Sequence, residues 1–114
     1  MHLEIRGTNI HFGTSVREHI TRQMESAIGQ NARRVGLAAV YVTDINGPQG
    51  GDDKQCRITA RLHGGKTICV EDTDHDLIRV IDRAAGRIKQ TLVQEVERRW
   101  NRRHQPESQE PTSD

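Results

Sequence analysis

The sequence has few aromatic residues and no long apolar run. Its only aromatic residues are Phe12, Tyr41 and Trp100, so it lacks a platform for stacking single-stranded bases. No apolar stretch approaches the roughly 20 residues that span a bilayer. The first residues also lack the charged and apolar regions of a signal peptide. We therefore expect a cytoplasmic protein that has no membrane partner.

The spacing of cysteines and histidines excludes the common metal sites. No two histidines lie three or four positions apart and no Cys-x-x-Cys occurs, so zinc-ligand spacing is missing. Asp72, Asp74 and Asp76 have the spacing that opens a calcium-binding EF-hand loop. Leu77 and Arg83 stand where that loop needs glycine and glutamate. With no catalytic constellation either, we expect no metal, no cofactor, no small-molecule substrate and no enzymatic activity.

Charge is distributed unevenly between a basic domain and an acidic end. The chain has 114 residues, which suits a single domain. Residues 105–114 carry three acids and no base, so residues 1–104 hold 17 basic and 13 acidic residues, a net charge of +4. We expect a folded domain over residues 1–104 and a disordered tail over 105–114.

Hydrophobic patterning predicts six elements in the order β-α-β-β-β-α. A capping box, Ser15-Val16-Arg17-Glu18, predicts a helix that begins there and runs to about Asn31. The last helix is expected to begin after the cap candidate Thr73. Strand-like runs are predicted at residues 2–7, 36–46, 54–62 and 66–71, with a loop over 46–53. This order predicts an α+β, two-layer sandwich: a four-stranded sheet with two helices packed side by side on one face.

The predicted hairpin around residues 63–65 separates the two cysteines. Pairing Leu62 with Lys66 places Ala60 opposite Ile68, and Cys56 then lies on the same face as that pair. Cys69 falls on the opposite face, because strand side chains alternate. We therefore expect two free thiols and no disulfide.

The last helix combines an apolar face with a basic one. From residue 79 to residue 104 there are eight Lys/Arg and three acids. Arg79, Arg83 and Arg87 recur every four residues, so they form one ridge. The opposite side is apolar and consists of Leu77, Ile81, Ala84, Ile88 and Leu92. Such a ridge suits a polyanion, with nucleic acid as the first candidate, although a merely solvated helix face has the same pattern.

Two charged residues limit the packing of this helix. Glu95 and Arg99 occupy the next positions at the core-facing angle and do not belong in an apolar core. We therefore expect the helix to extend beyond the sheet after about Val96. Its final turn, residues 98–103, is expected to project into solvent as a basic end.

Two stretches resemble the family of short ribosome hibernation factors, formerly called sigma-54 modulation proteins (the hibernation promoting factor and ribosome-associated inhibitor group). IRGTNI at residues 5–10 and TSVREHI at 14–20 resemble the family's opening strand, turn and first helix. LHGG at 62–65, VED at 70–72 and DLIRVID at 76–82 resemble its hairpin and the start of its second helix. The resemblance covers about residues 3–93, and the order and spacing of the stretches make it specific.

This resemblance implies a bacterial translation inhibitor that silences idle ribosomes in stationary phase or under stress. It implies binding to 16S rRNA of the small (30S) ribosomal subunit, in the channel of messenger and transfer RNA. Matching positions make Arg22, Arg83 and Arg87 candidate RNA-binding residues, and Arg79 joins them on the geometry of the ridge. Secondary candidates are Lys89, Arg98 and Arg102. Recognition is then expected to use phosphates and RNA shape.

The sequence also departs from the family's pattern. Thr8, Gln23 and Gln90 stand where the family usually has lysine or arginine. Fewer phosphate contacts imply weaker and less salt-dependent binding. Where long family members add a second, dimerising domain, this chain ends, so we expect no pairing of ribosomes by the protein alone. The acidic tail over 105–114 either competes with RNA for the basic helix or is an inert solvated end.

An interaction module that no longer binds ribosomes is the alternative function. It would contact a protein partner through the loop over 46–53 or through the open sheet face, with Tyr41, Thr43, Arg57 and Arg61. Salt distinguishes the two functions, because phosphate binding weakens with salt and an apolar protein contact hardly changes.

Overall fold

The computed structural model describes residues 2–45 and 53–104, with side chains described as far as residue 100. The predicted loop over 46–53, apart from residue 53, and the predicted tail over 105–114 lie outside the described residues. The elements are β1 (His2–Thr8), α1 (Thr14–Ile28), the 3-10 helix η1 (Gly29–Arg34), β2 (Val35–Asp44), β3 (Lys54–Leu62), β4 (Thr67–Asp74) and α2 (Leu77–His104). The predicted β-α-β-β-β-α order and α+β class are confirmed.

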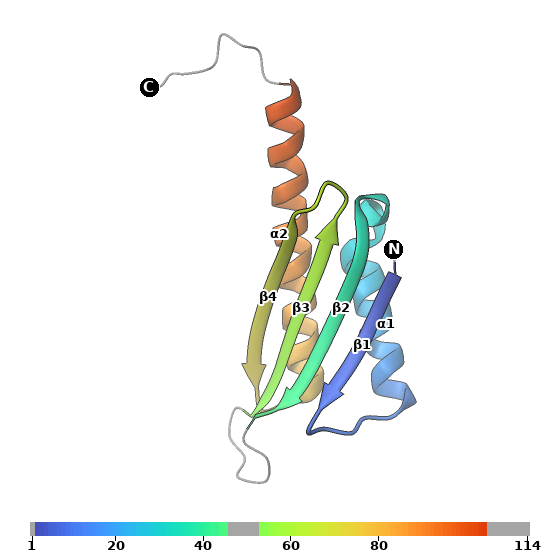
Figure 1. Cartoon of the computed structure of the whole chain (residues 1–114). Helices are drawn as coiled ribbons and strands as arrows, with labels where there is room; N and C mark the ends of the chain where they lie inside the picture. The colour runs from blue at the N-terminus through green and yellow to red at the C-terminus, as the bar shows by residue number, and fades with distance from the viewer. Residues whose placement is uncertain (1, 46–52, 105–114) are drawn as a thin grey trace.

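The four strands form one mixed sheet in the order β1-β2-β3-β4. β1 and β2 are parallel, and the two remaining pairs are antiparallel. Figure 1 shows α1 and α2 side by side on one face of the sheet, as predicted, while the other face is open. α2 contacts α1, β3 and β4, so it covers the half of the sheet that α1 does not.

The helices bury the residues that their spacing predicts. Ile20, Met24 and Ile28 of α1 are buried, and so are Ile81 and Ile88 of α2. They pack against the apolar row that β2, β3 and β4 present on the same side. A fully buried side chain of this size contributes about 1.5–3 kcal/mol. Because one face of α2 is fixed in this way, its opposite face is held toward solvent.

The hairpin between β3 and β4 has the predicted register. Ala60 lies opposite Ile68, and the Leu62 amide donates to the Lys66 carbonyl at 2.7 Å. Gly64 and Gly65 adopt φ values of +103° and +102°, a backbone region that side chains with a Cβ rarely occupy. Glycine is therefore required at this turn.

Both cysteines are free, as predicted. Cys56 is buried on the helix side of β3, whereas Cys69 is exposed on the open face. Burial, with a smaller contribution from Asp72, raises the pKa of Cys56 to about 12. Cys56 is therefore a packing residue and stays protonated at neutral pH.

The predicted capping box is wrong. α1 begins at Thr14, its N-cap is Gly13, and no side chain caps it. Gly13 has the extended conformation of a cap residue and its carbonyl accepts from the Arg17 amide, so Ser15 lies inside the first turn. The α-helix also ends at Ile28, before the predicted Asn31, because the chain tightens into the 3-10 helix η1.

The predicted start of the last helix is wrong as well. β4 continues to Asp74, pairing with β3 as far as Lys54, so Thr73 is a strand residue and not a cap. Asp76 caps the helix, since its Oδ1 accepts from the Arg79 amide at 3.1 Å. Asp72 and Asp74 therefore belong to the end of the edge strand, and only Asp76 stands at the start of the helix.

Packing of α2 against the hairpin also extends further than predicted. Glu95 is only 5% exposed, although the sequence argued against burial at this position. Arg99 Nη1 donates to the His63 carbonyl at the β3–β4 turn, at 3.0 Å. Beyond these contacts the end of α2 extends past the sheet (Figure 1).

Candidate nucleic-acid interface

The three predicted ridge arginines are exposed along α2, opposite the buried face of that helix. Arg79 lies in the first turn, where its side chain makes no hydrogen bond or ion pair with another described residue. Five N–H donors of its guanidinium are therefore available to a ligand. Arg83 and Arg87, in contrast, both have partners on β4.

Arg83 is held by two carboxylates of the edge strand. Its guanidinium donates to Asp72 Oδ1 at 3.2 Å and to Asp74 Oδ2, and also to the Thr73 carbonyl at 3.3 Å. The hydrogen bonds that Arg83 donates to Asp74 and then to Asp72 raise the pKa of Arg83. The pKa of Asp74 is lowered by the amide of Asp76 and further by Arg83. The middle of the ridge is thus anchored to β4 and its charge is balanced by two acids.

Arg87 makes weaker contacts with the same strand. Its Nη1 donates to the Glu71 carbonyl at 2.8 Å and lies 3.9 Å from Asp72 Oδ2. The side chain is 56% exposed. A carbonyl hydrogen bond uses one N–H and leaves the charge in place, so Arg87 keeps most of its capacity for a phosphate.

The acids that hold Arg83 continue the helix-facing row of β4. Ile68, Asp72 and Asp74 are separated by even numbers of residues, so they point to the same side of the strand. Asp72 pairs with Cys56 of β3, and Asp74 pairs with Lys54. The alternating pattern of β4 can be read from the sequence. Had the strand been predicted to run as far as Asp74, this pattern would have placed Asp72 and Asp74 on the side that faces α2.

Arg22 extends from the exposed side of α1. Its side chain makes no hydrogen bond or ion pair with another described residue. The two helices are in contact, and His19 of α1 and Asp82 of α2 connect them, with Nε2 and Oδ1 2.6 Å apart. Arg22 and Arg79 therefore lie on the same layer of two packed helices.

The secondary candidates differ in their surroundings. Lys89 is exposed on α2 and has no polar partner among the described side chains. Arg98 is paired with Glu95 at 3.2 Å, but its side chain remains 58% exposed. Arg102 belongs to α2, and its side chain lies outside the described part of the structure.

Glu95 organises three cations at the far end of α2. Its carboxylate lies 3.0 Å from Lys66 Nζ, 3.2 Å from Arg98 Nη1 and 3.5 Å from Arg99 Nε. The hydrogen bond from Lys66 is the main reason why the pKa of Glu95 is lowered. Sequence reasoning missed this cluster, because Lys66 reaches it from the hairpin turn.

The open sheet face carries the residues of the alternative function. Arg57 stacks on the Tyr41 ring with its guanidinium carbon 4.9 Å from the ring centroid, and the two residues are paired across β2 and β3. Arg61 and Thr43 lie on the same face of these strands. The structure thus brings the alternative residues together on the face that the helices leave uncovered.

Comparison with known proteins agrees with the fold. The model of the family described as sigma 54 modulation protein / S30EA ribosomal protein matches residues 3–100. No match was found among curated proteins. No helix within residues 2–45 and 53–104 is long and apolar enough to cross a membrane.

Two solved structures have the same fold at low sequence identity. The Protein Y N-terminal domain of Thermus thermophilus is 22% identical, with a TM-score of 0.66 over 83% of this chain and 99% of that one. A ribosomal subunit interface protein from Coxiella burnetii is 16% identical, with a TM-score of 0.72 over 85% of this chain and 99% of that one. Together with the family match over residues 3–100, the fold leads to one conclusion. The chain belongs to the sigma-54 modulation protein / S30EA ribosomal protein family.

Proposed function

We propose that this protein is a cytoplasmic hibernation factor that binds the small ribosomal subunit and inhibits translation. Membership of the family, over residues 3–100, is the observation that carries the proposal. The structural relative from Coxiella burnetii is a ribosomal subunit interface protein, which supports the same kind of partner. The protein acts by occupying the channel of messenger and transfer RNA, without catalysing a reaction.

The proposed contact surface is the solvent-facing side of the helix layer. Arg22 and Arg79 contribute most, because neither guanidinium is paired with another described side chain. Arg87 contributes through the donors that its carbonyl contact leaves unused. Arg83 contributes least, because Asp72 and Asp74 already balance its charge. Lys89, Arg98 and Arg102 extend the surface along α2 toward its end.

The chemistry of these residues favours 16S rRNA backbone over bases. A guanidinium grips a phosphate with two parallel hydrogen bonds, and phosphate contacts fix position without reading sequence. The helix layer therefore recognises the course of the RNA backbone in the channel, and blocks it sterically.

Translation in vitro tests the inhibitory part of this proposal. Adding purified protein to a bacterial translation reaction should reduce synthesis, and Arg22→Ala/Arg79→Ala should relieve most of that inhibition. Arg6→Ala/Arg61→Ala, on the open sheet face, removes the same charge and should inhibit like the wild type. Synthesis that stays unchanged at a large molar excess over ribosomes would rule out inhibition.

A protein-interaction module remains the second candidate, favoured by the stacked Arg57–Tyr41 pair on the open sheet face. An aromatic and arginine pair of this kind is typical of protein contact surfaces. In that case Tyr41→Ala should abolish capture of the partner protein, and Arg79→Ala should leave it intact.

A further inference from the structure

A basic pocket lies at the opposite end of the domain from Arg79. It is formed where the end of η1, the β3–β4 turn and the last described turn of α2 meet, and has a volume of about 300 Å³. Arg79 and Arg99 are 20 residues apart on one helix, which corresponds to about 30 Å at 1.5 Å per residue. The pocket is therefore separate from the ridge.

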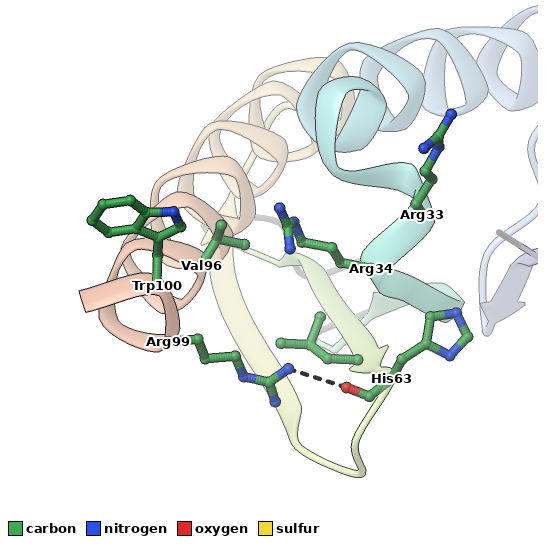
Figure 2. A pocket seen from close by; sticks show the side chains of 7 residues that line it. Arg33, Arg34, His63, Val96, Arg99 and Trp100 are labelled. Atoms are coloured by element: carbon green, nitrogen blue, oxygen red, sulfur yellow. Dashed lines mark hydrogen bonds between the residues drawn. The ribbon is translucent and has the colours of Figure 1, made fainter. Parts of the chain in front are cut away.

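The backbone of His63 fixes the floor of this pocket. Its amide donates to the Arg34 carbonyl at 2.9 Å, and its carbonyl accepts from Arg99 Nη1 at 3.0 Å. Figure 2 shows Arg34 and Arg99 on opposite sides of the space in front of β3, with Trp100 at its rim. Three segments distant in sequence are thus held in one arrangement before any ligand binds.

Positive charge is concentrated in the pocket, and Glu95, which is not among its lining residues, balances part of it through Arg99 at 3.5 Å. Arg33, Arg34 and Arg99 line it, and no acidic side chain is among the described residues that do so. Neither Arg33 nor Arg34 has a hydrogen-bond or ion-pair partner for its side chain in the described part of the chain. Figure 2 shows Arg34 facing Arg99 across the space, with the Arg33 side chain directed away from it. The charges of Arg33 and Arg34 are not balanced by a described acid, so a bound anion would offset them. The planar fork of arginine matches a phosphate.

The remaining wall of the pocket is apolar and aromatic. Leu62 and Val96 line it beside Trp100, a residue that is 57% exposed. The chain lacks a row of aromatic residues on which several bases could stack, but this one exposed indole next to arginines offers a flat surface for a single base. The volume lies at the lower end of the range of small-molecule sites, which suits a single nucleotide.

We propose that this pocket binds one nucleotide, with its phosphate between Arg34 and Arg99, the charge of Arg33 close by, and its base against Trp100. Two sources present the same chemistry: a free mononucleotide, or an unstacked nucleotide within an RNA strand. Only the second source rests on the proposed function, since it would be part of ribosome binding. The first would make the protein responsive to a small molecule.

Tryptophan fluorescence reports directly on the pocket, because Trp100 is the only tryptophan of the chain. Titration with AMP is expected to quench it saturably, whereas adenosine and ribose 5-phosphate each bind more weakly. Arg33→Ala/Arg34→Ala should weaken AMP binding about tenfold or more, because hydrogen bonds to a charged group are lost. Arg6→Ala, which removes one exposed guanidinium from β1, should bind AMP like the wild type.

A tetra-adenylate without a terminal phosphate distinguishes the two sources. Tighter binding of the oligonucleotide than of AMP would assign the pocket to an RNA strand, and tighter binding of AMP would assign it to a free nucleotide. Calorimetry with Trp100→Ala provides a second readout, with at least about tenfold weaker binding expected. Absence of saturable binding by both ligands, or equal AMP affinity in Arg33→Ala/Arg34→Ala, would overturn the proposal. No ribosome is present, so this failure would be distinct from a failure of the proposed function.

Discussion

Neutralising the acids of β4 should increase RNA binding by the ridge. Asp72 and Asp74 hold Arg83 at the middle of α2, so Asp72→Asn/Asp74→Asn removes the charges that compete with a phosphate for that guanidinium. The amide oxygen introduced at position 74 can still accept the hydrogen bond that Asp74 takes from the amide of Asp76. The turn before α2 is therefore expected to persist, and an unchanged circular dichroism spectrum checks this.

The size of the effect follows from counterion release. Each phosphate contact adds about 0.7–0.9 to the slope of log affinity against log salt. Releasing Arg83 adds one contact, so the slope should become steeper by about that amount. Between 200 mM and 50 mM salt this corresponds to about a threefold larger gain in affinity than in the wild type.

Titration of labelled protein with small ribosomal subunits over a salt series measures this slope. Glu4→Gln/Glu71→Gln changes the net charge equally on the open sheet face and should leave the slope unaltered. In the wild type, Arg83→Ala should hardly change the slope. In Asp72→Asn/Asp74→Asn, the same substitution should remove the increase in slope, and the four proteins together form a double-mutant cycle. The reasoning is refuted if Arg83→Ala alone reduces the slope by a full contact, because Arg83 would then already bind phosphate.

Three further predictions concern stability and reactivity. Glu95→Gln should lower the free energy of unfolding by about 1.5–3 kcal/mol in urea, since charge-assisted hydrogen bonds are lost; a change below about 0.5 kcal/mol would contradict this. The pKa of Glu95 is lowered in the folded protein. The stability that its carboxylate contributes is therefore fully present above the ordinary pKa of glutamate and is lost as pH falls through the folded-state pKa. The Glu95→Gln variant should consequently lose less stability between neutral and acidic pH than the wild type. Ile88→Ala should cost about 2–5 kcal/mol by opening a cavity under α2, and a near-neutral result would show that this site is not packed. A thiol reagent at neutral pH should modify Cys69 rapidly and Cys56 only on unfolding, because burial raises the Cys56 pKa to about 12; equal rates would disprove that burial.

Periodicity predicted the parts of the fold that depend on local spacing. Alternation in β3 and β4 was sufficient to place Ala60 opposite Ile68 and to separate Cys56 from Cys69. Helical spacing likewise predicted the burial of Ile81. These features follow from which side chains share a face, and that is set by the geometry of each element alone.

Element boundaries were less predictable, because several residues could serve as caps. Thr73, Asp74 and Asp76 all have cap-forming side chains, and Asp76 becomes the cap because pairing with β3 keeps the two earlier residues in the strand. Gly13 took the N-cap of α1 by adopting an extended backbone, which left Ser15 inside the helix. Tertiary pairing decides such cases, and it is not encoded in the local motif.

Partners of the candidate site residues were the least predictable. Arg83 is 9 residues from Asp74 along the chain, and Arg99 is 36 residues from His63. Such contacts depend on where a strand ends and on how far a helix crosses the sheet. The basic pocket is a further case, because Arg34 and Trp100 come together only once η1 and the end of α2 have packed.

Co-sedimentation with small ribosomal subunits across a salt series tests the central claim most directly. The wild type should co-sediment at low salt and dissociate as salt rises, while Arg22→Ala/Arg79→Ala/Arg87→Ala should fail to co-sediment. Arg6→Ala/Arg57→Ala/Arg61→Ala removes three arginines from the opposite face and should co-sediment like the wild type. A folded wild-type protein that does not co-sediment at low salt would contradict the account. Loss of binding only in the sheet-face variant would move the interface to the other side of the molecule.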